Sequence, residues 1–497
     1  MHQSKLLNLS FSLSIIFLFA CSIEKDDQIN YREKNISNSD YDMIYESGNW
    51  EHPDYSKAFE SLGNHRIVIE VDDLTEGLFQ VRIPWRRKDD NPQEKAVFIV
   101  DAKTNTLVEN MQVLEVNNES GHFVFEPNKG SSKYYVYYLP HASTGSYYPK
   151  LHYIKPLDSN TDPLTSKYKL SSEQIEKLPQ AKIISAQSID NFNSFFPMEI
   201  IATKEEVSNF IQKNPKPFYL FPEYRERSIK MDDYLPLHWI KSLNNVNGLY
   251  DKVLRGEYYT FQIGVFAPDE NLKNIRIQFT DLKNGKNIIL KESITCFNTS
   301  GVDLNGVPFK KTINVVSGKI QALWFGIDIP ETAKQGEYLG QVIVKPEGPV
   351  SDTVYIKLKV INKVIANHGD DSPENMSRLR WLNSTIGTDP NFIVKPFEAV
   401  KIDDKTISII GRDIELNEYG LPENISSYFT QEMTSLKKDK EEVLAGPIRF
   451  ELINEDGLPE KWNTDPYTID QTYPSEAYWE LINTSKKFKM KVILQLI

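Results

Sequence analysis

Pairs of consecutive aspartates are the residues whose type and spacing come nearest to acid–base chemistry. Cleavage of a glycosidic bond needs two carboxylates about 5–10 Å apart, on either side of the bond. Neighbouring side chains on a strand point to opposite faces of the sheet, so consecutive aspartates do not meet this requirement. We therefore interpret the pairs as solvated turns and assign no catalytic residue. They are Asp72-Asp73, Asp89-Asp90, Asp232-Asp233, Asp370-Asp371 and Asp403-Asp404.

Motifs for nucleophilic, nucleotide-binding or zinc chemistry are missing from the sequence. GxSxG, GxxxxGK[ST], GxGxxG and HExxH do not occur. The eight histidines are scattered along the chain without the spacing of metal ligands. The sequence therefore predicts no metal site and no cofactor.

Two further positions have a chemical and a structural interpretation. The run Asp303-Leu304-Asn305-Gly306 begins like a calcium loop but lacks the later ligand positions, so an Asn-Gly turn is favoured. Cys296 lies in the strand-like run ESITCFN, with no histidine-bearing motif around it. A small buried apolar residue is favoured over a reactive thiol.

Exposed aromatic rings are candidates for stacking on sugars. The run from Tyr134 to Tyr138 places tyrosines on both faces of one predicted strand, which favours core on one face and an interface on the other. A sugar-binding platform is the alternative. Trp381 alternates with Arg378 and Arg380, which favours core packing with an ion pair over direct contact with a ligand.

The N-terminus has the form of a lipoprotein signal. Lys5 precedes an apolar run from Leu6 to Phe19, which is too short to span a bilayer comfortably, and Ala20 stands before Cys21. This pattern resembles the lipobox of bacterial lipoproteins, in which the cysteine is acylated after cleavage. The acidic residues that follow resemble the surface-export signal of Bacteroidetes lipoproteins. We expect residues 1–20 to be a signal peptide and Cys21 a lipid attachment site that tethers the chain to the outer membrane or cell surface; an ordinary secretion signal is the alternative.

Composition limits the possible classes of protein. The length of 497 residues suggests about three domains. A composition of 40% hydrophobic and 25% charged residues is typical of globular chains. The net charge of −12 argues against nucleic acid as a partner. Two cysteines are too few for a disulfide scaffold, and 25 Tyr with 25 Phe favour strands.

Short runs of alternating hydrophobicity about ten residues apart indicate antiparallel β-sandwiches. Capping-box patterns at Ser171 and Thr203 mark short helices between two such regions. The predicted fold is mainly β, with tandem Ig-like sandwiches and a short, partly helical connector. The predicted ranges are 1–20 (signal peptide), 21–48 (flexible tether), 49–156 (first sandwich), 157–234 (connector), 235–366 (Ig-like sandwich) and 367–497 (incomplete β-sandwich).

The final residues predict a strand with one apolar face. Phe488, Met490, Val492, Leu494 and Leu496 alternate with polar residues up to Ile497. We expect such a strand to pair on both sides, and the sequence ends without a hairpin return. The interpretation is a truncated chain, cut inside its last domain, with an open sheet edge near residues 486–497.

Several long phrases together resemble one family. They include MEIIATKEEV (198–207), LFPEYRERSIKMDDYLPLHWI (220–240), RGEYYTFQIGVFA (255–267), CFNTSGVDLNGVPF (296–309), KIQALWFGIDIPETAKQGEYLGQVIV (319–344), SRLRWLNSTIG (377–387) and YGLPENISSYF (419–429). They resemble the N-terminal region of Bacteroidetes proteins related to glycoside hydrolase family 123, over nearly all of the mature chain. The resemblance implies β-sandwich domains before a catalytic (β/α)₈ barrel with β-N-acetylgalactosaminidase activity. In that activity the acetamido group of the substrate is the nucleophile, an Asp orients it, and an adjacent Glu is the acid/base.

No Asp-Glu pair here corresponds to the catalytic pair of the family, so no catalytic residue is carried over. The expected function is that of an N-terminal accessory region of a glycosidase that degrades N-acetylhexosamine glycans, with the barrel missing from this chain or encoded separately. A stand-alone glycan-binding surface lipoprotein without hydrolytic activity is the alternative. A purely structural surface protein is a third possibility. Whether this chain is itself an enzyme stays open.

Overall fold

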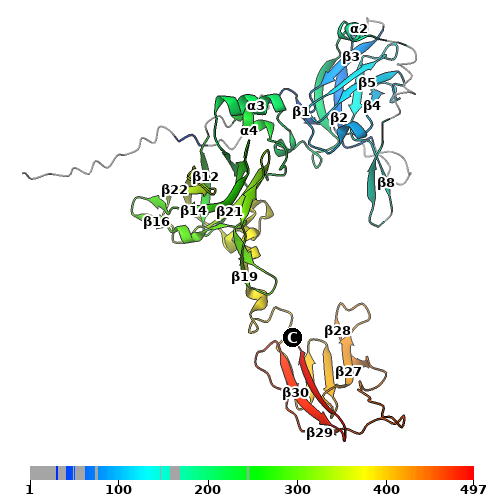
Figure 1. Ribbon diagram of the computed structural model, residues 1–497, viewed down its shortest axis with the longest axis vertical. Helices are drawn as coiled ribbons and strands as arrows, with labels where there is room; N and C mark the ends of the chain where they lie inside the picture. The colour runs from blue at the N-terminus through cyan, green and yellow to red at the C-terminus, as the bar shows by residue number, and fades with distance from the viewer. Residues whose placement is uncertain are drawn as a thin grey trace, which may run out of the picture. The chain divides into compact units, whose positions relative to one another are not determined.

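The computed structural model describes residues 29–31, 41–48, 50, 62–72, 77–145, 147–156, 168, 170–242 and 246–496. Strands dominate these residues and helices are few and short, which confirms the predicted mainly β class (Figure 1). The chain forms two compact units. The first comprises residues 1–299 and 311–379, and the second comprises 300–310 and 380–497. No helix within the described ranges is long and apolar enough to cross a bilayer.

The first sandwich of unit 1 consists of two sheets around one core. One sheet has the order β1-β10-β2-β7-β4 and the other β3-β6-β5. Ile67, Val81, Phe123 and Val136 are among the fully buried side chains between them. The strands are β1 Tyr45–Ser47, β2 His65–Glu70, β3 Phe79–Ile83, β4 Phe98–Asp101, β5 Met111–Val116, β6 Gly121–Phe125, β7 Lys133–Tyr137 and β10 Lys182–Ser188, and a separate hairpin holds β8 His141–Thr144 and β9 Lys150–Tyr153.

The segment predicted as a connector is partly helical and also contributes strands. Helix α2 (Ser172–Glu176) is capped by Ser171 and helix α3 (Lys204–Lys213) by Thr203, each with the capping box expected from the sequence. Strand β10 lies between β1 and β2 of the first sandwich, and β11 (Tyr219–Tyr224) joins the second sandwich. Strand β10 pairs with β2, which lies more than 100 residues earlier in the chain. Local sequence patterns do not reveal such a distant partner.

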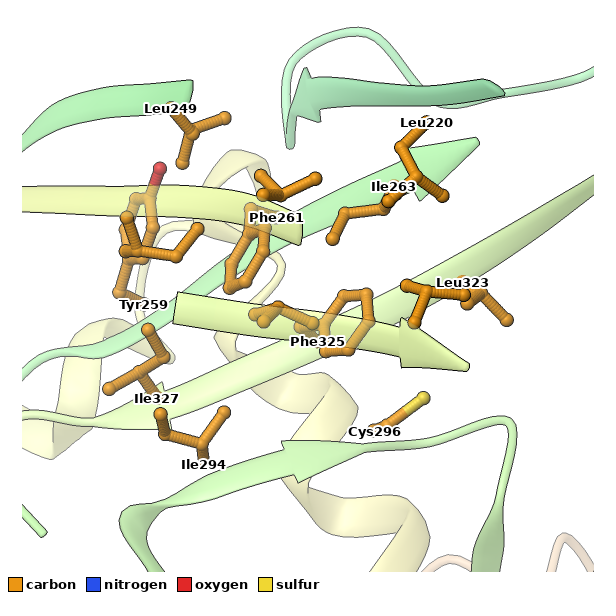
Figure 2. Close-up of a cluster of buried hydrophobic side chains, with 14 of the residues drawn as sticks. Leu220, Leu249, Tyr259, Phe261, Ile263, Ile294, Cys296, Leu323, Phe325 and Ile327 are labelled. Atoms are coloured by element: carbon orange, nitrogen blue, oxygen red, sulfur yellow. The ribbon is translucent and has the colours of Figure 1, made fainter. Parts of the chain in front are cut away.

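The second sandwich of unit 1 has the larger core. A sheet of order β11-β13-β21-β17 faces a sheet of order β12-β23-β22-β14-β20. Phe261 of β13 is directly opposite Phe325 of β21, and their rings are nearly parallel with centroids 5.0 Å apart (Figure 2). The strands are β12 Gly248–Arg255, β13 Tyr258–Phe266, β14 Leu272–Phe279, β17 Ile294–Cys296, β20 Ile313–Val315, β21 Ile320–Asp328, β22 Gly336–Lys345 and β23 Asp352–Val364, with β15 Leu282–Asn284 and β16 Asn287–Ile289 beside β22.

Helices cover the outer face of the β11-β13-β21 sheet. Helix α4 (Leu237–Ser242) places Trp239 against Phe221, with parallel rings 4.5 Å apart at their centroids. Phe210 of α3 also contacts Phe221, with ring centroids 6.1 Å apart. Because both faces of the sheet are covered, every residue of β13 is buried.

Unit 2 has a smaller core between two sheets. The five-stranded sheet runs β24-β25-β26-β27-β28 and the three-stranded sheet runs β29-β30-β31. Ile407, Trp479 and Leu481 lie at the centre of the core. The strands are β24 Lys401–Asp403, β25 Thr406–Ile409, β26 Arg412–Leu416, β27 Pro422–Phe429, β28 Leu436–Glu442, β29 Asn463–Thr464, β30 Ala477–Thr484 and β31 Lys489–Leu496, and the hairpin of β18 Ser300–Val302 and β19 Pro308–Lys310 belongs to the same unit.

The last strand has the alternation expected from the sequence. Met490, Val492, Leu494 and Leu496 are half-buried, and Val492, Leu494 and Leu496 pack against the unit 2 core. Within the described residues β31 pairs only with β30, so it is an edge strand of this sheet.

Candidate functional site

Two predicted positions concern cysteine. Cys21 lies outside the described residues, so its role as a lipid attachment site stays a prediction. Cys296 is buried in the core of the second sandwich, as expected (Figure 2). Burial raises the pKa of its thiol to about 11, so the thiolate is scarce at neutral pH.

The tyrosine run of β7 is occupied by protein on both faces. Tyr134 and Tyr138 belong to the core of the first sandwich. On the opposite face, the Arg66 guanidinium lies 3.6 Å from the Tyr135 ring centroid and 4.1 Å from that of Trp50. This arrangement matches the favoured interpretation of core on one face and a protein interface on the other.

Trp381 does not have the environment predicted for it. The run from Ser377 to Asn383 is a 3₁₀-helix and not a strand, so the alternation with Arg378 and Arg380 has no inward face. The Trp381 side chain is 53% exposed, and Arg378 Nε donates to the Asp370 carbonyl oxygen. The expectation of core packing for Trp381 was therefore wrong.

The Asp303 loop is a turn. The Asp303 Oδ1 atom accepts hydrogen bonds from the backbone amides of Asn305 and Val307, both at 2.9 Å, and Gly306 has φ +75°. The carboxylate is thus engaged with its own backbone. No cluster of three or more potential metal ligands occurs among the described residues.

Two of the five aspartate pairs line one cavity of unit 1. Asp89-Asp90 and Asp232-Asp233 border a space of about 570 Å³ together with three lysines and two tyrosines. Asp89 is paired with Arg87 (2.5 Å) and with Lys95, and Asp233 is paired with Lys319. Although burial opposes it, these two cations lower the pKa of Asp89. Asp89 and Asp233 are therefore held in structural ion pairs, which perturb pKa values without marking a catalytic site.

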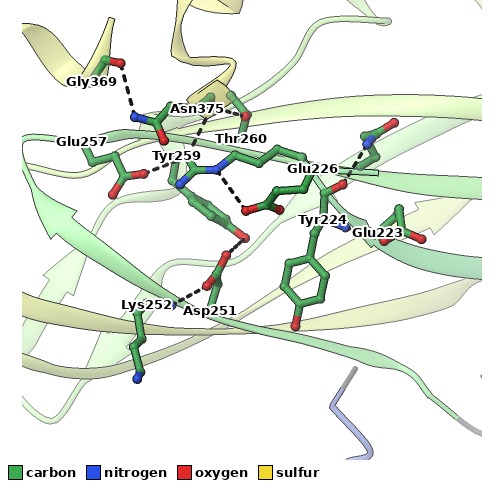
Figure 3. Close-up of polar contacts among 12 residues, drawn as sticks. Glu223, Tyr224, Glu226, Asp251, Lys252, Glu257, Tyr259, Thr260, Gly369 and Asn375 are labelled. Atoms are coloured by element: carbon green, nitrogen blue, oxygen red, sulfur yellow. Dashed lines mark hydrogen bonds and ion pairs between the residues drawn. The ribbon is translucent and has the colours of Figure 1, made fainter. Parts of the chain in front are cut away.

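A buried polar network anchors the second sandwich (Figure 3). Arg225 donates to Glu257 at 2.8 Å and to the Asn375 carbonyl oxygen at 3.2 Å, and Thr260 donates to the same oxygen at 3.0 Å. The Tyr259 hydroxyl donates to Asp251, and burial together with this carboxylate raises its pKa well above 10. Every one of these groups has a protein partner, so the network fixes the 3₁₀ segment at Asn375 to the sheet.

Glu223, in the phrase LFPEYRERS, is the centre of a second buried set. This fully buried carboxylate accepts hydrogen bonds from Arg227 Nε at 2.8 Å and Trp239 Nε1 at 3.0 Å, and lies 3.2 Å from His238 Nε2. It joins β11 to α4 beneath the helical layer. Because solvent does not reach it, we assign it a structural role.

The site with open, convergent groups is in unit 2, and sequence reasoning missed it. We call it the Trp462 cavity. It encloses about 630 Å³ and is lined by Leu416, Asn417, Glu418, Tyr419, Glu423, Pro447, Arg449, Phe450, Glu451, Pro459, Glu460 and Trp462. These residues come from the end of β26, from the turn between β26 and β27, from the start of β27 and from the long segment between β28 and β29.

Local hydrogen bonds build the walls of the Trp462 cavity. The Asn417 side chain accepts from the amides of Tyr419 and Leu421 and donates to the Ile448 carbonyl oxygen at 3.1 Å. The Ile448 amide donates to Pro422, so the long segment is tied to β27. Further along the same segment, the Asn454 side chain accepts hydrogen bonds from the amides of Asp456 and Leu458. They enclose a turn at Gly457, which has φ +75°.

The lining of the cavity combines rings with carboxylates. Tyr419 and Trp462 are half-buried, and Phe450 is 55% exposed. A hydrogen bond to the Glu418 carboxylate, with burial and the charge of Glu418, raises the pKa of Tyr419 despite nearby Arg449. Four glutamates face one arginine in the lining. Such a cavity is suited to holding a polyhydroxylated ligand by ring contacts and hydrogen bonds.

Two family descriptions match the sequence. "Glycoside hydrolase 123, N-terminal domain" matches residues 56–189, and "Glycoside hydrolase 123, third domain" matches residues 400–496. Residues 56–189 and 400–496 thus match two domains of glycoside hydrolase family 123. The first match covers β2 to β10 of the first sandwich and the second covers the sheets of unit 2, so the Trp462 cavity lies within the residues that match the third domain.

Solved structures add only distant similarity. A family 123 glycoside hydrolase from Clostridium perfringens, described in terms of glycolipid glycan hydrolysis, is 21% identical over 30% of this chain and 28% of that chain, with a TM-score of 0.24. The match therefore spans less than a third of that enzyme. The PapD-like domain of human CEP192 (11% identical, 23% of this chain and 82% of that chain, TM-score 0.17) and the E. coli chaperone DraB (10%, 56% and 97%, TM-score 0.17) are also similar. At these scores the similarity says nothing about function, and no curated protein matches the sequence.

Proposed function

We propose that this chain is the accessory β-domain region of a family 123-like glycosidase that acts on N-acetylhexosamine glycans. The observation that carries the proposal is the presence of two separate family 123 domains on one chain, at residues 56–189 and 400–496. The described residues form sandwiches, without the strand–helix repeats of a (β/α)₈ barrel. We therefore assign to them the holding of glycan, and assign hydrolysis to a barrel with which this region associates.

The proposal includes the location of the protein. Acylation of Cys21 would place the sandwiches at the outer membrane or cell surface, where extracellular glycans are available. The acidic residues after Cys21 and the net charge of −12 agree with a surface protein that does not bind nucleic acid.

Binding of glycans by the intact chain tests the proposal. We expect immobilised N-acetylgalactosamine- or N-acetylglucosamine-terminated oligosaccharides to retain the purified protein, and glucose polymers of the same length to retain at least about tenfold less. The chain by itself should release no 4-nitrophenol from 4-nitrophenyl N-acetyl-β-galactosaminide. Equal retention on both supports, or none, would contradict the proposed substrate class.

The alternative is a glycan-binding surface lipoprotein that acts without any barrel. The Trp462 cavity favours this alternative, because the rings and carboxylates that line it all come from unit 2. The two functions differ in one measurable respect. Co-purification of the chain with a hydrolase that cleaves N-acetylhexosaminides supports the accessory role, whereas binding without such a partner supports the alternative.

A further inference from the structure

The Trp462 cavity presents apolar ring surface that the fold does not use. Phe450 is 55% exposed, and Tyr419 and Trp462 are half-buried, while none of the three belongs to the hydrophobic core of unit 2. Rings that border a concave space offer flat faces to a ligand whose own surface alternates apolar and polar groups. A pyranose has such a surface, because its C–H groups gather on one side and its hydroxyls project from the edge.

The polar groups of the cavity are available to a ligand. Among the described residues, no hydrogen bond or ion pair reaches the carboxylates of Glu423, Glu451 or Glu460. The Trp462 indole N–H is buried and likewise has no acceptor within the part of the chain that the structure describes. A buried donor without an acceptor is uncommon in proteins, and a ligand oxygen is one way to satisfy it.

The charge of the lining selects between classes of sugar. Four glutamates against one arginine leave a surplus of negative charge around the cavity. Ionised carboxylates accept hydrogen bonds from hydroxyl and amide N–H groups but repel sulfate and carboxylate groups. A neutral sugar is therefore accepted and an anionic one is rejected.

The cavity is also preformed. Asn417 holds the β26–β27 turn and the segment at Ile448 in place, and the Glu460 amide donates to the Leu452 carbonyl oxygen at 2.7 Å near Trp462. A ligand therefore does not have to order the walls, which lowers the entropic cost of binding.

We propose that the Trp462 cavity is a binding site for neutral pyranose sugars that discriminates against sulfated and sialylated ones. The site lies in unit 2 and would hold one part of a glycan while another part of that glycan is processed elsewhere. The preference for a neutral sugar follows from the cavity itself, and only the expectation that this sugar is an N-acetylhexosamine rests on the proposed function.

Calorimetry on the intact chain tests the site with two probes. The first is a neutral N-acetylgalactosaminyl-β-galactoside, and the second is the same disaccharide with a 6-sulfate. We expect the neutral probe to bind at least about tenfold more tightly than the sulfated one, since several like charges near the anion each weaken binding modestly.

Tryptophan variants supply the matched control. Trp462→Ala should weaken binding of the neutral probe about tenfold or more, and Trp462→Phe should retain part of the affinity because it keeps a ring but loses the N–H donor. Trp381→Ala removes an exposed indole of the same unit that does not line the cavity, and should leave binding unchanged. Circular dichroism of each variant checks that the sheets remain folded.

The outcomes separate this site from the proposed function. If hexosamine glycans retain the intact chain while Trp462→Ala and Trp381→Ala bind alike, the cavity proposal fails and the proposed function stands. If neutral hexosides without an acetamido group bind through Trp462 as tightly as N-acetylated ones do, the site stands and the proposed substrate class fails.

Binding of the sulfated probe as tightly as the neutral one overturns the proposed discrimination against anionic sugars. Glu423→Gln with Glu460→Gln should narrow the difference between the probes, and no change would count against the electrostatic argument.

Discussion

Single residues in this chain owe their roles to neighbours that are distant in sequence. Trp381 and Trp462 both follow polar, non-repetitive sequence, yet Trp462 lines a cavity and Trp381 lies on a 3₁₀-helix with about half its surface exposed. Cys296 is inert through burial, whereas the proposed role of Cys21 depends on a processing signal. Residue type alone does not separate these cases.

Substitution of Cys21 tests the lipid anchor. Cys21→Ser should abolish incorporation of labelled palmitate and move the protein from the membrane fraction to the soluble fraction, because the acyl chains supply the anchoring free energy. Cys296→Ser is the control, since its thiol is buried and should not be acylated, so labelling should persist. Labelled palmitate in Cys21→Ser would contradict the assignment.

Core packing at Phe325 gives a prediction about stability. Phe325 is fully buried against Phe261, so Phe325→Ala should lower the free energy of unfolding of unit 1 by about 3–5 kcal/mol. Phe192→Ala removes a ring that is 96% exposed and should change it by less than about 0.5 kcal/mol. Urea denaturation monitored by fluorescence measures the free energy of unfolding of both variants. Similar losses of this free energy in the two variants would be inconsistent with the packing described.

At the scale of elements, an ion cluster around Arg86 helps to attach the helical segment to the first sandwich. Arg86, just after β3, donates to Glu206 of α3 at 2.7 Å and to Asp42 at 2.5 Å, and its side chain is only 6% exposed. Burial alone would raise the pKa of Glu206, but hydrogen bonds from Arg86 and from the Thr203 amide, with the charge of Arg86, lower it below its usual 4.5. The same glutamate completes the capping box of α3.

This cluster predicts a pH dependence of unit 1. Because the pKa of Glu206 is lower in the folded state, its contribution to stability is complete above pH 4.5 and is lost as the pH falls through the folded-state value. The urea midpoint of the wild type should fall more steeply below pH 4.5 than that of Glu206→Gln, which has no proton to gain. Glu173→Gln, on the exposed surface of α2, should follow the wild type, and parallel curves for all three proteins would exclude Glu206 as the source.

At the scale of the whole molecule, the chain has two compact units with separate cores. The interior of unit 1 consists of two sandwiches and a helical layer, and unit 2 has a single core around Ile407 and Trp479. Units with their own cores generally unfold in separate transitions.

Calorimetric unfolding checks this independence. Trp479 is 4% exposed and donates to the Gly420 carbonyl oxygen at 2.9 Å, so Trp479→Ala should lower the midpoint of one thermal transition only. Phe325→Ala should lower the other. A single transition that moves with either substitution would show that the two units unfold together.

The sequence by itself determined the features that depend on local chemistry. Alternating apolar residues indicated strands in the three sandwich regions, and the capping residues Ser171 and Thr203 located two helix starts. The family phrases indicated the family whose domain descriptions match. These signals are contained in a few consecutive residues, so they can be read without the fold.

Only the tertiary structure decided which distant segments meet. It placed β10 between β1 and β2, exposed Trp381 on a 3₁₀-helix, and assembled the Trp462 cavity from residues 416–423, 447–451 and 459–462. None of these three segments carries a catalytic or ligand-binding motif, because the cavity forms only where a β turn and a long loop border the same space. The physical reason is that strand pairing and loop closure are long-range, and a local pattern of residues contains no record of its partner.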